Sequence, residues 1–410
     1  MARPTPVEQA TVEIECLASV RILALTQLYP TPLQQTLASF NRQQFAELSR
    51  LHELRIIRPI PWPMAALHWI RGQSIEKAPT TTGSIAAQYP LYYYLPRVRN
   101  DLFGPCLESS VRKPVERTIE SFRPDVLLTS WAHPDGWATM QFGRRAGLPV
   151  VLKVLGSDIL VLATGRRRQR IVETLCGVES VIAVSEDLAR HVIRMGAPPS
   201  RVHVVPEGLN TEIFSPGDQG VARSRLGLPA NGKMILFVGN LLKSKGAVDL
   251  VRACAVLRDR GIQFSCRIVG QGSDAASVER MIRTSHLADS VSCAGARPHA
   301  ELADWFRASD VVTLPSYSEG IPNVLREAIS CGKPFVSTSV GGIPEISDPS
   351  FSRLVPPGSI AELAEALAHM LEHTPQVDQN IVRRINISWG DSARLLAGHL
   401  QAAVDSRSTR

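Results

Sequence analysis

The stretch that decides the fold is "SYSEGIPNVLREAISCGKPFVS", residues 316–337, which leads from an apolar run into an amphipathic one through a short polar turn. The preceding run, "DVVTLPS" (310–316), predicts a buried strand. Because Pro322 restricts the residue before it to an extended conformation, we predict that a helix, "VLREAIS", follows with Asn323 as its N-cap. A buried strand that passes at once into a helix is typical of a parallel sheet covered by helices.

The same alternation recurs in both halves of the 410-residue chain. Apolar runs that predict strands lie at 20–26, 53–60, 125–130, 149–157, 180–185 and 201–206, and again at 234–240, 264–270, 290–295, 310–316, 334–339 and 352–358. We therefore predict an α/β chain of two Rossmann-like, doubly wound domains facing across a cleft. The expected parts are a first domain at 1–205 with the C-terminal helix of residues 386–410 packed back onto it, a linker at 206–220, and a second domain at 221–385. Residues 59–111 fit the alternation poorly and are expected to be irregular.

Composition limits the function classes. With 44% hydrophobic and 20% charged residues the chain reads as globular, and no apolar run approaches the roughly 18 residues of a membrane-spanning helix. The segment "CLASVRILAL" lacks the features of a secretory signal, so a cytoplasmic location is expected. The net charge of +7 indicates an anionic partner, and contact with an anionic membrane on its inner face stays open. No nucleic-acid-binding motif is present.

Glu319 and Glu327 flank the predicted helix start with seven residues between them. Backbone amides at a helix N-terminus bind phosphate, and carboxylates bind vicinal hydroxyls through charge-assisted hydrogen bonds. The two carboxylates therefore suit a nucleotide sugar whose diphosphate lies at the helix start. The alternative is that Glu319 only stabilises a turn and that Glu327 is a solvated helix residue.

Several segments resemble one family. "SYSEGIPNVLREAISCGKPFVSTSVGGIPEI" (316–346) resembles the signature of glycosyltransferase family 4, retaining nucleotide-sugar transferases of GT-B architecture, with wording closest to the bacterial surface and exopolysaccharide branch. Further segments that resemble the family, in the expected order, are 180–218, "ILFVGNLLKSKGAVDLV" (235–251), "IVGQGS" (268–273) and "GARPHAELADWFRASDVVTLPS" (295–316). The resemblance implies transfer of a hexose from a nucleotide-diphosphate sugar to a carbohydrate or lipid-linked acceptor, in polysaccharide or glycolipid biosynthesis. It implies no metal and no cofactor beyond the nucleotide-sugar co-substrate.

The resemblance also implies roles for individual residues. Glu319 would contact the donor sugar, Lys245 would neutralise the leaving diphosphate, and Asp158 would face the reaction from the first domain. Glu327 would bind the ribose. The other residues expected to bind substrate are Gly320, Ile321, Pro322, Asn323, Val324 and Leu325 at the phosphate and sugar, Gly239, Asn240 and Lys243 in the loop before them, and Gly270, Gln271, Gly272, Arg297 and Pro298 beside the nucleobase.

The chain departs from the family pattern at several positions. Asn240 stands where arginine is usual, Leu155 stands where histidine is common, and "YPTPLQQTLASFNRQQ" replaces a glycine-rich turn after the first strand. His133, at the end of a predicted strand, either substitutes for the histidine missing at 155 or orients a loop. These departures leave two other classes open: an epimerase or phosphorylase of the same architecture, and a non-catalytic scaffold that binds nucleotide sugars.

Three other signals carry less weight. "GQGSDA" (270–275) satisfies a dinucleotide-binding pattern but lies away from the first turn of its domain, where that pattern belongs. His369 and His373 have the spacing of metal ligands on a helix but no third ligand nearby. "RRRQR" (166–170) is either an exposed helix face or a clamp for an acceptor diphosphate or anionic lipid.

Overall fold

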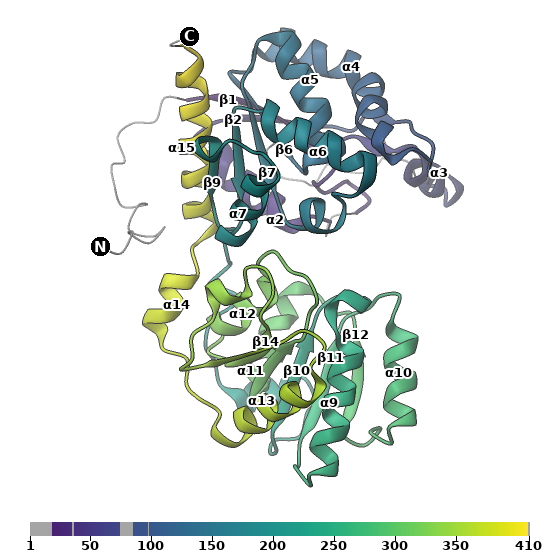
Figure 1. Ribbon diagram of the computed structural model, residues 1–410, viewed down its shortest axis with the longest axis vertical. Helices are drawn as coiled ribbons and strands as arrows, with labels where there is room; N and C mark the ends of the chain where they lie inside the picture. Colours follow the sequence, from purple (N-terminus) through teal and green to yellow (C-terminus); the bar gives the residue numbers. More distant parts are fainter. Residues whose placement is uncertain (1–18, 35–36, 74–84, 97, 409–410) are drawn as a thin grey trace. The chain divides into compact units, whose positions relative to one another are not determined.

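The structure is a computed structural model that describes residues 19–34, 37–73, 85–96 and 98–408. The chain divides into two compact units (Figure 1). Unit 1 comprises Met1–Gly208 and Trp389–Arg410, and unit 2 comprises Leu209–Ser388. Both are α/β, as expected from the sequence.

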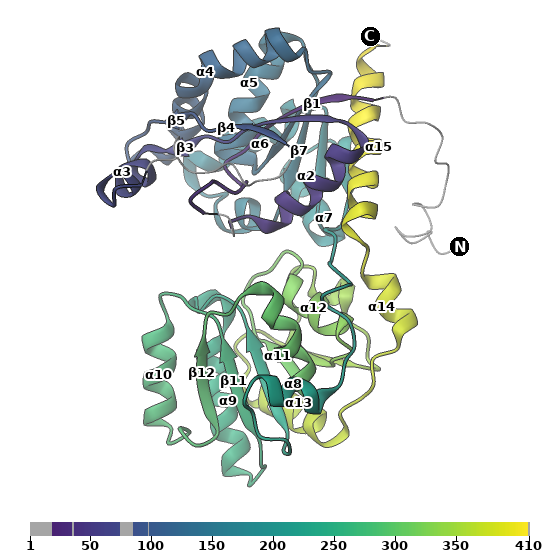
Figure 2. The ribbon, with the colours of Figure 1, turned by 180° about the vertical axis from the view of Figure 1, so that it is seen from behind.

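Unit 1 is built, within the described residues, on a parallel sheet of seven strands in the order β4-β2-β1-β6-β7-β8-β9 (Figures 1 and 2). The order reverses between β1 and β6, which is the topological switch point of a doubly wound sheet. A separate parallel pair joins β3 to β5. The strands are β1 (Arg21–Leu25), β2 (Glu53–Ile57), β3 (Ile60–Pro61), β4 (Ala86–Gln88), β5 (Leu91–Tyr92), β6 (Val126–Ser130), β7 (Val150–Val154), β8 (Ser180–Ala183) and β9 (Val202–Val204).

Helices cover both faces of this sheet, and each face has its own apolar cluster. Phe45 and Leu48 of α2 pack with Leu396 and Leu400 of α15 on one face, so the C-terminal helix completes unit 1. On the other face α4 to α7 bury side chains such as Val111. The helices of unit 1 are α2 (Ser39–Leu51), α3 (Trp62–Ile70), α4 (Phe103–Phe122), α5 (Trp137–Ala146), α6 (Gly165–Gly177), α7 (Glu186–Arg194) and α15 (Trp389–Ser408), with short turns η1 (Asn100–Leu102), η2 (Ala132–Gly136), η3 (Ser157–Val161) and η4 (Pro199–Arg201).

Unit 2 repeats the plan with a parallel six-stranded sheet in the order β12-β11-β10-β13-β14-β15, whose switch point lies between β10 and β13. Its strands are β10 (Met234–Val238), β11 (Ser265–Val269), β12 (Val291–Gly295), β13 (Val311–Leu314), β14 (Phe335–Thr338) and β15 (Ser352–Val355). Its helices are α8 (Gln219–Arg225), α9 (Ala247–Asp259), α10 (Ala275–Thr284), α11 (Leu302–Ala308), α12 (Asn323–Ser330), α13 (Ile360–His373) and α14 (Gln379–Ile385), with turns η5 (Lys243–Lys245), η6 (His299–Glu301) and η7 (Ile343–Ile346).

Two expectations about the chain's organisation differ from the structure. The segment 206–220, expected to be a linker, lies mostly in unit 2, where Phe214 is fully buried in the apolar core. Residues 59–111, expected to be irregular, contain α3 and the first two turns of α4. In the sequence, Pro105 and Pro114 argue against a helix here. In the structure, Pro105 lies in the first turn of α4, where proline is tolerated, and Pro114 is accommodated inside the helix. None of the described helices is long and apolar enough to cross a membrane.

Candidate active site

The switch point of unit 2 brings together the loops that follow β10 and β13. Gly246, at the end of η5, has φ 71°, and a Cβ at this position would lie 2.0 Å from the carbonyl oxygen of Pro315. The backbone N–H of Tyr317 donates to the carbonyl of Ser244 at 2.8 Å. Only glycine permits so close an approach with positive φ, so the sequence fixes the contact between the two loops.

Lys245 and Glu319 form an ion pair across this contact. The Lys245 Nζ donates to both carboxylate oxygens of Glu319, at 2.7 and 2.8 Å, and the Ser316 hydroxyl donates to Glu319 Oε1 at 2.6 Å. The Glu319 side chain is 7% exposed and the Lys245 side chain is 26% exposed. The Glu319 carboxylate is therefore held by two partners within the protein. Two residues expected to act on different parts of a substrate neutralise each other instead.

Glu327 has a similar partner on a neighbouring loop. His299 Nε2 lies 2.8 Å from Glu327 Oε1, and Glu327 is 6% exposed, whereas half of the His299 side chain is exposed. The hydrogen bond to Glu327 raises the pKa of His299 above its usual 6.5, against the opposing effect of burial. Glu327 is thus not a solvated helix residue. Sequence reasoning missed His299, although its place directly after Arg297 and Pro298 at the end of a predicted strand was a usable signal.

Helix α12, on which Glu327 lies, begins one residue earlier than predicted. Pro322, not Asn323, occupies the N-cap position of α12, and no side chain caps the helix there. The Pro322 carbonyl accepts from the amide of Leu325 at 3.1 Å, and the side chain of Asn323 accepts from Arg326 at 3.4 Å. Leu325 is fully buried, so its expected contact with substrate could come only from its backbone.

The loop that precedes α12 is fixed from the opposite side. The amide of Gly342 donates to the carbonyl of Gly320 at 2.6 Å, and a Cβ on Gly341 would lie 2.0 Å from the carbonyl oxygen of Glu319. Ile321 and Val324 are half-buried. The backbone from Glu319 to the helix start is therefore held in place by contacts within the protein.

The loops after β10 and β11 lie against each other at the same edge. A Cβ on Gly270 would lie 1.9 Å from the carbonyl oxygen of Gly239, and one on Gly272 would lie 2.3 Å from that of Leu241. The amide of Leu241 donates to the carbonyl of Gln271 at 2.9 Å. These contacts account for the glycines of "GQGSDA" without a dinucleotide.

The other residues expected at this edge are exposed. Asn240, Lys243 and Gln271 are exposed after β10 and β11. Arg297 donates to the carbonyl of Ala294 at 3.1 Å, and Pro298 is the N-cap of η6. Every site residue expected in the second half thus lies on loops that follow β10, β11, β12 or β13 at the carboxyl edge of the sheet, or within α12 behind β13.

Asp158 in unit 1 is fully buried and bonded to the protein's own backbone. Its carboxylate accepts from the amides of Leu155, Gly156 and Ala132, each at 3.1 Å. Burial raises the pKa of Asp158 to about 6, although these hydrogen bonds act in the opposite direction. The resemblance implies that Asp158 faces the reaction, but in the structure its carboxylate faces the protein's own backbone. It positions the loops after β6 and β7.

His133 is also buried, at 2% exposure. Its Nε2 accepts from the amide of Gly104 at 3.2 Å, and its Nδ1 has no hydrogen-bond partner among the described residues. Burial lowers the pKa of His133 to about 4. Of the two open interpretations, the orientation of a loop fits this geometry, because the ring contacts α4 and not the surface.

Sequence reasoning missed several buried polar residues at the carboxyl edge of the unit 1 sheet. Asp135 accepts from the Gln27 amide at 2.6 Å and from the Gln27 side chain at 2.7 Å. Lys153, 1% exposed, donates to Asn41 at 3.0 Å and also to Gln44. Their signal in the sequence was a charged residue inside an apolar run, for Lys153, or a few residues after one, for Asp135.

No metal centre emerges from the described part of the chain, where no three His, Cys, Asp or Glu side chains are grouped to hold an ion. His369 and His373 stack on each other with ring centroids 4.4 Å apart, and His373 Nδ1 lies 3.0 Å from the carbonyl of His369. Their spacing reflects ring packing at the end of α13.

Known proteins match both units. Residues 37–208 match the family described as glycosyl transferase 4-like domain, and residues 218–384 match glycosyl transferases group 1. The D-inositol 3-phosphate glycosyltransferase of Mycobacterium bovis (strain BCG / Pasteur 1173P2) is 30% identical over 339 residues, which cover 75% of this chain and 69% of the relative.

Solved structures extend the likeness to nearly the whole chain. The sucrose-phosphate synthase of Thermosynechococcus elongatus has a TM-score of 0.71 at 20% identity and covers 95% of this chain and 98% of its own. HepE of Anabaena, solved in complex with UDP, has a TM-score of 0.67 at 18% identity with the same coverage. At these identities the likeness shows the GT-B fold, and with the mycobacterial relative it establishes that this chain belongs to the group 1 glycosyltransferases.

Proposed function

We propose that the protein transfers a hexose, with retention of anomeric configuration, from a nucleotide-diphosphate sugar to a hydroxyl of a carbohydrate or lipid-linked acceptor. The expected setting is the synthesis of a polysaccharide or glycolipid, and a lipid-linked acceptor would bring the enzyme to a membrane surface. The observation that carries this proposal is the Lys245–Glu319 pair at the switch point of unit 2. Ligands of doubly wound sheets bind at this place.

The pair suggests how the leaving group is stabilised. A nucleotide diphosphate leaves readily only when its developing negative charge meets a fixed positive charge. Lys245 would supply that charge by exchanging one carboxylate oxygen of Glu319 for the diphosphate. The start of α12, which has no side-chain cap, would add backbone dipoles. No metal is required in this scheme, because Lys245 and the helix supply the positive charge.

The exchange would also release Glu319 to accept a hydrogen bond from a hydroxyl of the donor sugar. Glu327 would bind the ribose hydroxyls, with His299 holding its carboxylate in position. Retention through attack on the same face as departure needs no protein nucleophile. HepE has been solved with UDP and with UDP-glucose, so uridine nucleotides are the first donors to test. The mycobacterial relative is named for D-inositol 3-phosphate, which makes phosphorylated polyols suitable first acceptors.

Calorimetry with UDP on two variants tests the assignment. We expect Glu327→Ala to weaken UDP binding by about tenfold or more, the cost of losing a charge-assisted hydrogen bond. We expect Glu319→Ala to bind UDP nearly as well as the native protein but to release UDP from UDP-glucose much more slowly. Unchanged UDP affinity in Glu327→Ala would refute the ribose assignment. Binding of nucleotide sugars without any turnover, across a panel of donors and acceptors, would favour the scaffold alternative.

A further inference from the structure

Unit 1 presents a surface of large apolar side chains that the proposed transferase chemistry does not use. Trp69 is 80% exposed, Ile70 is 73% exposed and Leu95 is 70% exposed. They belong to a group on α3 and on the following segment 91–98, which we call the apolar surface: Trp62, Leu67, Trp69, Ile70, Leu91, Tyr93, Leu95 and Val98. Large apolar groups that gather on a surface in this way mark a site of contact with a partner or a membrane.

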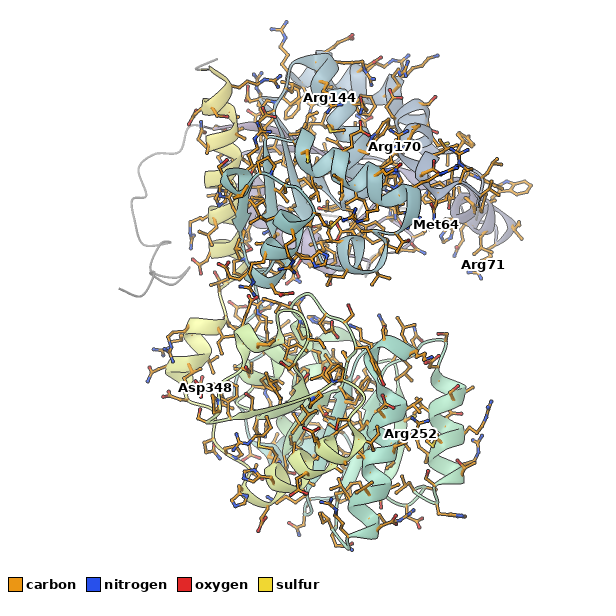
Figure 3. All side chains as sticks on the ribbon, viewed as in Figure 1. Met64, Arg71, Arg144, Arg170, Arg252 and Asp348 are labelled. Atoms are coloured by element: carbon orange, nitrogen blue, oxygen red, sulfur yellow. The ribbon has the colours of Figure 1, made fainter. Side chains whose placement is uncertain are left out.

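Local packing places the two segments side by side. Strand β3, which leads into α3, pairs with β5, and the Trp62 Nε1 donates to the carbonyl of Tyr94 at 2.6 Å. At 3.6 residues per turn, the four exposed apolar side chains of α3 span an arc of about 160°. The buried His68 lies on the opposite side of the helix. Figure 3 shows Met64 and Arg71 on α3 at the margin of unit 1, away from its sheet.

The composition of this region favours a lipid bilayer. Tryptophan and tyrosine prefer the boundary between hydrocarbon and headgroups, and leucine and isoleucine prefer the hydrocarbon itself. Of the described residues there, Arg71 on α3 and Arg99 beside Val98 are basic, and Asp101, the partner of Arg99, is acidic. A second copy of the chain would bring like charges together, whereas an anionic membrane would attract the excess positive charge.

A basic pocket adjoins the apolar surface. Arg99 follows Val98 directly, and with Asp101, Arg166, Gln169, Arg170 and Glu173 it lines a cavity of about 450 Å³. Asp101 is engaged by Arg99 at 3.0 Å, and Glu173 by Arg170 at 3.1 Å. Arg170, labelled in Figure 3, comes from α6.

The start of α6 adds positive charge, and its first turn contains no acidic residue. The helix dipole places partial positive charge there, and three consecutive arginines, Arg166 to Arg168, occupy the first turn, where acidic residues are normally favoured. The Nε of Arg167 is buried and has no hydrogen-bond partner among the described residues. Such an arrangement is destabilising alone and becomes favourable when an anion binds.

We propose that the apolar surface docks on an anionic lipid bilayer, with the basic pocket receiving a phosphate group of a lipid headgroup. The side chains of Trp69 and Ile70 enter the interfacial layer, and Arg166 and Arg170 bind the phosphate. This docking is independent of the proposed donor chemistry, but it would bring the enzyme to a lipid-linked acceptor.

Cosedimentation of the full chain with vesicles tests the proposal. The vesicles contain either phosphatidylcholine alone or phosphatidylcholine mixed with phosphatidylglycerol, without any acceptor. We expect binding to the mixed vesicles to be at least about tenfold stronger and to weaken in high salt. The double variant Trp69→Ser with Ile70→Ser should lower binding to both vesicle types by about tenfold or more. Arg166→Gln with Arg170→Gln should chiefly remove the preference for anionic vesicles.

Matched controls come from exposed residues of unit 2. Val221→Ser with Leu242→Ser removes exposed apolar side chains, and Arg280→Gln with Arg283→Gln removes exposed charges from α10. Both controls should bind vesicles like the native protein. Equal binding of the Trp69/Ile70 variant and the native protein would overturn the proposal. So would a dimer in solution that the Trp69/Ile70 variant converts to a monomer, because the apolar surface would then be a self-interface. UDP binding measured in parallel bears only on the proposed function.

Discussion

The two sheets reverse their strand order at equivalent places, but different kinds of side chain fill the two switch points. In unit 2 the loops after β10 and β13 meet through Lys245 and Glu319, and Lys245 remains partly exposed. In unit 1 the loops after β1 and β6 meet through Asp135, which is fully buried and bonded to Gln27. At the switch point of unit 2 a charged side chain is partly exposed, whereas at that of unit 1 the charged side chain is buried and holds its own loops together. Substitutions should therefore change chemistry in unit 2 and stability in unit 1.

The largest effect that would test this contrast is expected from Lys245→Ala. Removing a fixed positive charge that stabilises a leaving group typically costs about 10²–10³-fold in kcat. The fold should survive, because Lys245 is partly exposed and Glu319 keeps its hydrogen bond from Ser316. Steady-state kinetics of UDP release from UDP-glucose, compared with thermal melting, separates the two effects.

Lys243→Ala is the matched control for this variant. Lys243 occupies the same short turn, η5, but its side chain is exposed. We expect a loss of less than about tenfold in kcat, because an exposed charge is screened by solvent. Equal losses in Lys243→Ala and Lys245→Ala would show that general positive charge, and not the pair with Glu319, supports the reaction.

Asp158→Ala should change the stability of the protein and not its chemistry. Removing the carboxylate leaves the buried amides of Leu155, Gly156 and Ala132 without an acceptor. The free energy of unfolding should fall by about 3 kcal/mol or more, since each of the three unsatisfied buried amides costs about 1–3 kcal/mol. Hydrogen exchange should report lost protection at these three amides. If the variant keeps native exchange and melting but loses activity, Asp158 is a catalytic residue after all.

The sequence predicted the edge of unit 2 well, because its site residues lie on one short segment and on neighbouring strand ends. Glu319, Lys245 and the helix start follow directly from apolar runs, and parallel strands bring their carboxyl ends to one edge. The pairing of Lys245 with Glu319 was not predictable. It depends on the close approach of Gly246 to Pro315, which no pattern within either segment reveals.

The edge of unit 1 was harder to predict for a physical reason. A polar residue after a strand can point into solvent or back into the loop, and sequence period alone does not distinguish these directions. Asp158 was expected to face the reaction, and His133 was left between replacing a family histidine and orienting a loop, but both turn inward to backbone amides. The buried position of Lys153 depends on Asn41 and Gln44, more than 100 residues away in the sequence.

Lys153 offers a smaller test of the same contrast through pH. Burial lowers the pKa of Lys153 from 10.5 to about 8. Between these values the unfolded chain binds more protons than the folded chain, so this lysine makes the free energy of unfolding rise with pH. The rise should amount to roughly 1–3 kcal/mol between pH 8 and 10.5.

Chemical denaturation of the native protein and Lys153→Met at several pH values measures this contribution. The difference between the two unfolding free energies should change over this range. Lys113→Met, which removes an exposed lysine from α4, should show no such difference. Parallel pH profiles for the native protein and Lys153→Met would mean that Lys153 is not buried as described.

The smallest effect concerns the other pair of unit 2. The hydrogen bond to Glu327 raises the pKa of His299 above 6.5, so protonated His299 stabilises the folded state. This stabilisation is complete below the unfolded pKa and is lost as pH rises through the raised folded pKa. It should stay below about 1 kcal/mol, because half of the His299 side chain is exposed and solvent weakens the pair.

NMR titration of the ligand-free protein should find the raised pKa in the native chain and a value nearer 6.5 in Glu327→Gln. If His299 titrates alike in both proteins, Glu327 lacks the fixed partner that distinguishes the edge of unit 2, and its assignment to the ribose would have to stand on nucleotide binding alone.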